Sequence, residues 1–322
     1  MSADATGDLF TRCPANPVLT TADWPYPVNT VFNPAAAVVD GETVLLCRVE
    51  DRRGLSHLTV ARSADGVGDW RIDEKPFIVG DPSDDASRWG VEDPRITRVD
   101  ELDSWLIAYT AYGPDGPCVA LATTRDFRGV EQIGVAMPPE DKDACVLSRH
   151  IGGQYVLFHR PVARIYGRPA VWLSRSHDLR SWTRPEPVVV ARPGPWWDAA
   201  QVGMGPPPLD TPHGWLGLYH GVKRIAGDLI YRVGLVLLDR DNPAVVLRRS
   251  DEWVFAPAAP YELTGNANNV VFPTGLVHDP DTDQLRMYFG AADSAIALAT
   301  ARLSDVLAYA LSCPAPDPHR IW

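Results

Sequence analysis

The chain has 322 residues, and its 30 Lys and Arg against 41 Asp and Glu give a formal net charge of −11. An acidic chain without a Lys- and Arg-rich run argues against a nucleic-acid partner or a membrane-surface partner. The sequence contains no apolar run of about 18 residues, the length that crosses a bilayer. Residues 1–8 have neither a basic start nor an apolar core, so we expect no signal peptide and a cytoplasmic protein.

A pair of short apolar runs separated by a polar turn recurs five times along the chain. The first runs of these pairs are residues 43–49, 105–111, 155–159, 215–220 and 285–290. Their partners are residues 57–63, 118–124, 170–176, 231–238 and 295–300. A further strand-like run precedes each pair and begins near residues 33, 93, 143, 205 and 270. Each unit is therefore predicted to be a sheet of three strands, usually with room for a fourth.

Five such units without helices between them predict an all-β fold, a five-bladed β-propeller. A pair of β-sandwiches is the alternative, but it does not explain a strand triplet that returns about every 60 residues. The 30 Pro and 25 Gly disfavour long helices, and only residues 302–310 are predicted to form a short one. We expect a single propeller domain over residues 1–322, with an N-terminal extension at 1–30 and blades at about 31–80, 90–135, 141–190, 200–255 and 266–310.

The starts of the five predicted inner strands are polar. They lie at residues 33–34, 90–95, 141–144, 201–208 and 268–275. In a propeller these starts meet at one mouth of the central channel. The acidic candidates near the mouth are Glu92, Asp93, Asp143 and Asp293, and the cationic or proton-carrying candidates are Arg95, Lys142, Arg160 and His220. Several cations gathered in an acidic protein predict an anion-binding site.

Aromatic residues near the same mouth are candidates for stacking on sugar rings. They are Trp24, Tyr26, Tyr112, Trp196, Trp197, Tyr231 and Phe272. Indole and phenol rings combine a large apolar face with a polar edge, which suits a ligand that has both. Because the chain has 11 Trp, we expect most of them to pack between blades.

We find no metal motif or nucleotide motif in the sequence. Its five cysteines are widely spaced and form no Cys-x-x-Cys: Cys13, Cys47, Cys118, Cys145 and Cys313. We interpret them as structural free thiols in a reducing compartment. The His-Glu-x-x-His motif, the EF-hand loop, the glycine-rich nucleotide fingerprints and Gly-x-Ser-x-Gly are absent as well. We therefore expect no metal and no organic cofactor.

Several motifs together resemble glycoside hydrolase family 130. Four of them are residues 90–96 (GVEDPRI), 159–161 (HRP), 214–222 (GWLGLYHGV) and 290–293 (GAAD). The likeness runs from about residue 33 to about residue 307. It implies a five-bladed propeller, in agreement with the repeat count. It also implies an inverting phosphorylase of β-mannosides that releases α-mannose 1-phosphate, while a minority of members are β-mannosidases that use water.

The resemblance also implies roles for the side chains at the mouth. Asp93 would be the general acid that protonates the glycosidic oxygen, with inorganic phosphate as the co-substrate. The positions implied to bind phosphate are Lys142, Arg160, Gln201, His220 and Tyr231. The predicted substrate-binding residues are Asn33, Arg48, Glu92, Arg95, Tyr112, Phe272 and Asp293.

Two positions bear on whether phosphate or water is the nucleophile. Asn33 stands where related five-bladed furanosidases carry the Asp that serves as base, which favours phosphorolysis because phosphate is already an anionic nucleophile. Gln201 stands where phosphorylases usually carry Lys or Arg, and losing one charge-assisted hydrogen bond weakens phosphate binding by roughly 1.5–3 kcal/mol. Water as nucleophile would need a carboxylate base, with Asp143, Glu252 and Glu262 as the candidates.

The sequence thus predicts a β-mannoside phosphorylase. A β-mannosidase of the same fold is the first alternative, and a non-catalytic glycan-binding propeller is the second. The expected partners are a β-mannoside oligosaccharide and inorganic phosphate, with no nucleic acid and no membrane. The linkage and the acceptor sugar depend on the loops at residues 80–89, 162–169 and 224–228. The sequence leaves the oligomeric state open, a homo-oligomer included.

Overall fold

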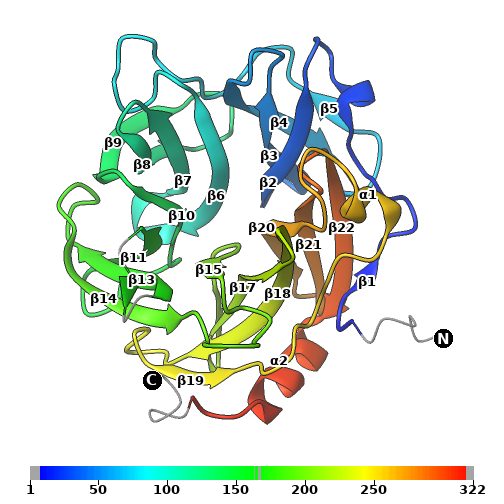
Figure 1. The fold of residues 1–322 in the computed structure, drawn as a ribbon. Coiled ribbons are helices and arrows are strands. Elements are labelled where there is room, and N and C mark those ends of the chain that lie inside the picture. Colours follow the sequence, from blue (N-terminus) through cyan, green and yellow to red (C-terminus); the bar gives the residue numbers. More distant parts are fainter. Residues whose placement is uncertain (1–7, 163, 166–167, 317–322) are drawn as a thin grey trace.

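The computed structural model describes residues 8–162, 164–165 and 168–316. Over this part of the chain, five antiparallel sheets surround a central channel like the blades of a propeller (Figure 1). In each blade one end strand of the sheet lies nearest the axis, and the other strands lie further outward. The predicted all-β, five-bladed propeller is confirmed.

The first three blades follow one another along the chain. Blade one contains β2 (Thr30–Val39), β3 (Glu42–Glu50), β4 (Ser56–Ser63) and β5 (Arg71–Ile72). Blade two contains β6 (Val91–Val99), β7 (Ser104–Gly113), β8 (Gly116–Thr124) and β9 (Glu131–Met137). Blade three contains β10 (Asp141–Val146), β11 (Tyr155–Pro161), β12 (Arg164–Ile165), β13 (Arg168–Ser176) and β14 (Thr183–Val190).

The last two blades complete the ring. Blade four contains β15 (Gln201–Met204), β16 (Leu209–Thr211), β17 (Gly214–Ile225), β18 (Asp228–Leu238) and β19 (Val246–Arg249). Blade five contains β20 (Val271–Asp279), β21 (Gln284–Ala291), β22 (Ala295–Arg302) and β1 (Thr11–Arg12). The predicted helix is α2 (Leu303–Ser312), and the sequence did not indicate the single turn α1 (Pro260–Leu263) or the 3-10 turns η1 (Thr21–Asp23) and η2 (Asp100–Leu102).

Two residues of the N-terminal extension add a strand to blade five. β1 pairs antiparallel with β22, the last long strand of the chain. Arg12 fixes this pairing, because its Nε donates to Glu262 Oε1 over 2.8 Å and its Nη2 donates to the Ala256 carbonyl over 2.6 Å. An uncovered β22 would leave an open sheet edge, and the N-terminal strand covers it.

Apolar clusters between neighbouring blades hold the ring together. One cluster joins blades one and two, and includes Leu46, Val60 and Ile107. Strands buried on both faces explain why the sequence shows nearly continuous apolar runs. All five cysteines are free, and four of them are buried. In the described chain, no helix has the length and apolarity needed to span a membrane.

Candidate active site

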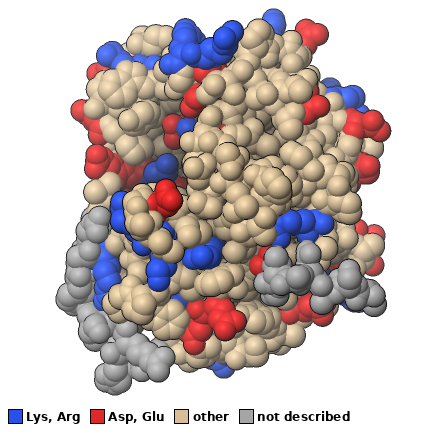
Figure 2. Space-filling model, turned by 45° about the vertical axis from the view of Figure 1, so that its right-hand side comes forward, with Lys and Arg blue, Asp and Glu red and all other residues tan. Residues whose placement is uncertain are grey.

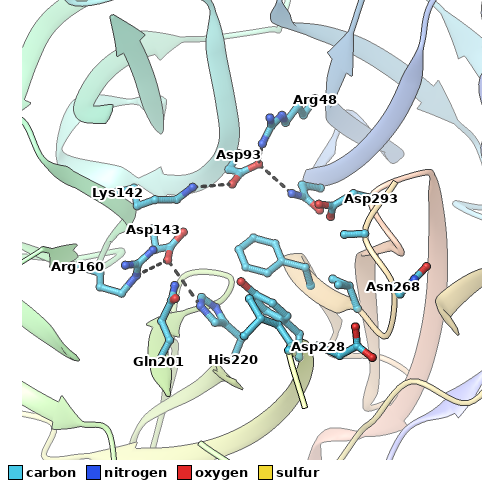
Figure 3. Close-up of a pocket in the computed structure, with 17 residues that line it drawn as sticks. Arg48, Asp93, Lys142, Asp143, Arg160, Gln201, His220, Asp228, Asn268 and Asp293 are labelled. Carbon is cyan, nitrogen blue, oxygen red and sulfur yellow. Dashed lines mark hydrogen bonds and ion pairs between the residues drawn. The ribbon is translucent and has the colours of Figure 1, made fainter. Parts of the chain in front are cut away.

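A cavity of about 360 Å³ opens where the inner strands begin (Figure 3). All five blades contribute to its walls. Its charged lining residues are Arg48, Asp93, Lys142, Asp143, Arg160, Asp228 and Asp293. Its other polar and aromatic lining residues include Asn33, Gln201, His220, Tyr231, Asn268 and Phe272. In the close-up, Lys142 and Arg160 lie on one side of the cavity and Asp293 lies on the other.

Three inner strands carry a β-bulge that directs a polar side chain into the cavity. The ladders of β2 with β3, β6 with β7 and β10 with β11 are each interrupted there. Asn33, Asp93 and Asp143 lie in these bulges, with φ of 45°, 46° and 54°. Asn and Asp adopt this left-handed backbone more readily than other residues with side chains. The bulge therefore explains why Asn or Asp occupies the same position in three blades.

Asp93 contacts three polar side chains in the cavity. Its Oδ1 accepts hydrogen bonds from Asn33 Nδ2 over 2.8 Å and from Arg48 Nη1 over 2.9 Å. Lys142 Nζ lies 3.8 Å from its Oδ2. Burial raises the pKa of this carboxyl, but three nearby cations and the hydrogen bond from Asn33 outweigh burial and lower the pKa to about 2. In the free site Asp93 is therefore a carboxylate.

Asp143 forms a second ion pair in the same cavity. Its Oδ2 accepts a hydrogen bond from Arg160 Nε over 2.7 Å, and His220 Nε2 lies 3.6 Å from that oxygen. Burial raises the pKa of Asp143, but the charge of Arg160 and other nearby positive charge outweigh burial and hold the pKa well below its usual range. Gly203 permits this close packing, because a Cβ there would lie 2.6 Å from Asp143 Oδ2.

His220 is a neutral residue of the cavity, although the sequence suggested a cation or proton carrier. Its side chain is buried, and burial lowers its pKa to about 3. Its ring packs 4.7 Å from that of Phe272 and 5.9 Å from that of Tyr231, centroid to centroid. Neither ring nitrogen has a hydrogen-bond partner among the described residues. His220 can thus offer a ligand one donor and one acceptor, but no positive charge.

Asp293 occupies the turn between β21 and β22. It follows Ala292, and both residues have φ of 49°, as a tight hairpin turn requires. Thr30 Oγ1 donates to the Asp293 carbonyl over 2.6 Å and fixes this turn to blade one. Burial and the negative charge of Asp93 raise the pKa of Asp293 to about 6. The cavity thus holds two carboxyls that are ionised throughout the neutral range, Asp93 and Asp143, and a third, Asp293, that takes up a proton near pH 6.

Most of the predicted site residues line this cavity. They are Asn33, Arg48, Asp93, Lys142, Arg160, Gln201, His220, Tyr231, Phe272 and Asp293. They come from separate blades, so only the ring closure brings them together. The sequence indicated them through the polar strand starts and the family resemblance.

Three predicted substrate-binding residues lie outside the cavity lining. Glu92 Oε1 accepts a hydrogen bond from Arg48 Nη2 over 3.0 Å and so orients that arginine. Arg95 is fully buried, and its Nε donates to the backbone carbonyl of Gly205 over 2.9 Å. Tyr112 packs edge-on against the Trp89 ring. Glu92 and Arg95 belong to the same inner-strand start as Asp93. Glu92 is its neighbour and so points to the opposite face, and the bulge between Glu92 and Arg95 breaks the alternation that would place Arg95 beside Asp93.

The three carboxylates predicted as candidate bases lie in different parts of the structure. Asp143 alone lines the cavity. Glu252 lies in a different pocket. Glu262 is fully buried, pairs with Arg12 and accepts a hydrogen bond from the Ala258 backbone over 2.8 Å, so its role is structural.

Two polar lining residues have no role assigned from the sequence. Asp228 begins β18 after the Ala226–Gly227 turn, and Asn268 precedes β20. The signal for Asp228 was its place in the loop 224–228, which we expected to select the acceptor sugar. The loop 162–169, expected to have the same effect, includes residues 163, 166 and 167, which lie outside the described residues.

The cavity gathers several cations, but carboxyls outnumber them. Arg48, Lys142 and Arg160 face four carboxyls, and both arginines are ion-paired. Arg160 bonds Asp143 through Nε, and within the described chain its two terminal nitrogens have no hydrogen-bond partner. Basic and acidic side chains are also interspersed over the face shown in Figure 2. Among the described residues, no three His, Cys, Asp or Glu are placed to hold a metal ion.

Comparison with known proteins assigns the family. The sequence profile of glycoside hydrolase family 130, described as beta-1,4-mannooligosaccharide phosphorylase, matches residues 6–310. The chain belongs to glycoside hydrolase family 130. A beta-1,2-mannobiose phosphorylase of Listeria innocua is 36% identical over 79% of this chain and 68% of its own. A beta-1,4-mannooligosaccharide phosphorylase of Ruminococcus albus is 30% identical over 95% of this chain and 92% of its own.

Solved structures of family 130 share the fold. The Listeria innocua beta-1,2-mannobiose phosphorylase in complex with beta-1,2-mannobiose superposes with a TM-score of 0.85, covering 94% of this chain and 99% of that one at 29% identity. A second structure superposes with a TM-score of 0.81 at 26% identity and covers 99% of both chains. That structure is described as showing that the family of mannoside phosphorylases contains glycoside hydrolases that target beta-1,2 mannosidic linkages in Candida mannan. The family therefore includes both kinds of enzyme.

Proposed function

We propose that this family 130 protein is an inverting β-mannoside phosphorylase, which uses inorganic phosphate to convert a β-mannoside into α-mannose 1-phosphate. The observation that carries the proposal is a single cavity that joins Asp93 with Lys142 and Arg160. The reaction needs a carboxyl to protonate the leaving group and cations to hold an anionic nucleophile. Relatives that match most of this chain are named as mannoside phosphorylases.

In the proposed reaction, a phosphate oxygen attacks the anomeric carbon of the mannosyl unit from the face opposite the glycosidic oxygen. The bond from the anomeric carbon to that oxygen breaks, and the bonding electron pair stays on the leaving oxygen. A proton from Asp93 then neutralises it, either directly or through a sugar hydroxyl. Attack from the opposite face converts the β-linkage into an α-phosphate, so the configuration is inverted.

Asp93 must take up a proton before it can serve as the acid, because it is a carboxylate in the free site. Phosphate bound by Lys142 and Arg160 would engage the positive charge that now holds Asp93 ionised. It would also add negative charge nearby, and a like charge raises the pKa of a carboxyl. Phosphate binding and protonation of Asp93 therefore favour one another in this proposal.

The phosphate subsite is built from groups that donate hydrogen bonds. Arg160 has its two terminal nitrogens left for an anion, and Lys142 adds an ammonium group. Burial raises the pKa of Tyr231 to about 12, so its hydroxyl keeps its proton and can donate. Gln201 and His220 can each donate one neutral hydrogen bond.

The opposite wall is suited to the mannosyl ring. Phe272 offers an apolar face, while Arg48 and Asp293 offer a donor and an acceptor for hydroxyls. Asn33 holds Asp93 in place through its Nδ2, while its Oδ1 is buried against Gly290.

A β-mannosidase is the second candidate, and one observation favours it. Gln201 brings no charge to the phosphate subsite. Hydrolysis would require a carboxylate that activates water. Asp143 lines the cavity, but its ion pair with Arg160 holds its pKa well below the range of an effective base. Phosphorolysis needs no such base.

The test is turnover of β-1,2-mannobiose and β-1,4-mannobiose with and without inorganic phosphate, with the products identified by NMR. Phosphate-dependent α-mannose 1-phosphate supports the proposal, and free mannose without phosphate would identify a hydrolase. Asp93→Asn separates an enzyme from a glycan-binding propeller, because a general acid typically contributes about 10²–10⁴-fold in rate. We further propose that the enzyme works without metal or organic cofactor, in the cytoplasm, where five free thiols are stable.

A further inference from the structure

A second pocket of about 430 Å³ lies on the other face of the β17–β18 ribbon that walls the active-site cavity. Paired residues of the two strands share a face, and successive residues alternate between faces. His220 and Tyr231 therefore point into the cavity, while Lys223, Ile225 and Arg232 line the second pocket. The cavity and the second pocket are thus separated by one two-stranded ribbon, whose tip is exposed.

Indole rings form the walls of this second pocket. Trp253 is 43% exposed. Exposing a large apolar side chain to water is unfavourable, and such side chains often mark a binding site. Trp196 is held in place by Arg192, whose guanidinium lies 3.9 Å from its ring centroid. Trp197 is buried, and its Nε1 donates to the Asp251 carbonyl over 2.8 Å. Trp196 and Trp197 are therefore held in place before any ligand arrives.

Arg232 supplies an unsatisfied donor in the same pocket. Its guanidinium lies 4.3 Å from the Trp253 ring centroid. Its Nε is buried, and the guanidinium makes no hydrogen bond or ion pair with the described residues. An unpaired buried donor is unfavourable, and an acceptor brought by a ligand would relieve the cost. Asp251 and Glu252 add carboxylates that can accept from hydroxyl groups.

We propose that this second pocket binds mannosyl units of a longer substrate chain, beyond the linkage that is cleaved. A pyranose ring has an apolar C–H face that fits an indole and hydroxyls around its edge that fit Arg232 and Glu252. Aromatic walls combined with two cationic donors, Lys223 and Arg232, and two carboxylates match this ligand better than a wholly apolar or a strongly anionic one. The inference rests on the proposed function, because it takes the substrate to be a mannooligosaccharide.

The test compares long and short ligands in the Asp93→Asn background and in phosphate-free buffer. Calorimetry measures the dissociation constants of β-1,2- and β-1,4-linked mannohexaose and of the matching mannobioses. We expect Trp253→Ala to weaken binding of the hexaose by about tenfold and to change mannobiose binding less than about twofold. Arg232→Gln should show the same selectivity. Leu311→Ala on α2 and Arg240→Gln are the controls for an exposed apolar side chain and an exposed arginine.

An equal effect of Trp253→Ala on hexaose and mannobiose, or no effect on either, would overturn the proposal. Ultracentrifugation of wild type and Trp253→Ala tests the competing occupant, a second copy of the chain. A change in sedimentation without a length-dependent change in binding would also overturn it. If no mannoside is turned over but hexaose binding still depends on Trp253, the proposed function fails while the oligosaccharide site stands.

Discussion

Replacing Asp293 by Asn should stabilise the protein at neutral pH while removing a group from the active site. Asn has nearly the same shape and tolerates the left-handed backbone that Asp293 adopts. Burial and the charge of Asp93 raise the pKa of Asp293 from 3.8 to about 6. The folded protein therefore disfavours the ionised form of this carboxyl, and Asn cannot ionise.

The size of the effect follows from the pKa change. One pKa unit corresponds to about 1.4 kcal/mol, so a rise of roughly 2 units corresponds to about 3 kcal/mol at most. Unfolding entropy of roughly 2.1 cal/mol/K per residue gives about 0.7 kcal/mol/K for 322 residues. Asp293→Asn should therefore raise Tm by up to about 4 °C above pH 7.

The sign of the pH dependence makes this prediction specific. A carboxyl with a raised pKa destabilises the fold fully above the folded pKa and not at all below the unfolded pKa. The gain from Asp293→Asn should be complete above pH 6 and vanish as the pH falls through 3.8. Calorimetry at pH 8 and pH 4 measures it, with Asp228→Asn at the exposed rim as a control that leaves Tm unchanged. An Asp293→Asn protein with the same or a lower Tm at pH 8 would refute the reasoning.

Three other predictions concern turnover and packing. Asp93→Asn should lower kcat by at least about 10²-fold while calorimetry still detects mannobiose binding. Gln201→Lys should lower the KM for phosphate by about tenfold, because it adds a charge-assisted hydrogen bond; an unchanged KM would place phosphate elsewhere. Gly203→Ala should destabilise by about 1–3 kcal/mol in a urea titration, since its Cβ would lie 2.3 Å from His220 Cε1. Gly129→Ala, with nothing within 4 Å, is the matched control.

The fold could be predicted because its signal repeats. Five similar strand triplets gave the number of blades, and each buried strand is long enough to show an apolar run. The strand that the N-terminal segment adds to blade five is much harder to predict from the sequence. β1 has two residues, and only its pairing with Thr300 and Ala299 on β22 identifies it as a strand. A short edge strand carries too few residues for a pattern of its own.

The sequence predicted which residues form the candidate site better than it predicted their protonation states. Polar strand starts marked Asn33, Asp93 and Lys142, and they do line one cavity. The protonation of His220 depends on complete burial, which no local pattern in the sequence shows. Arg95 looked like a ligand for the same reason as Asp93, but its side chain is enclosed by backbone carbonyls of blade four.

The cations of the free site are paired with carboxylates, and this affects how the site could bind phosphate although Gln201 carries no charge. Lys142 and Arg48 now stabilise the ionised form of Asp93, and Arg160 stabilises that of Asp143. A phosphate that pairs with part of this positive charge leaves less of it to stabilise the Asp93 carboxylate and therefore raises the pKa of Asp93. Weakening these ion pairs costs free energy and so lowers phosphate affinity. The same change favours the protonated form of Asp93, which the reaction needs. Weaker phosphate binding and a protonated Asp93 therefore both follow from the ion pairs that the cations form in the free site.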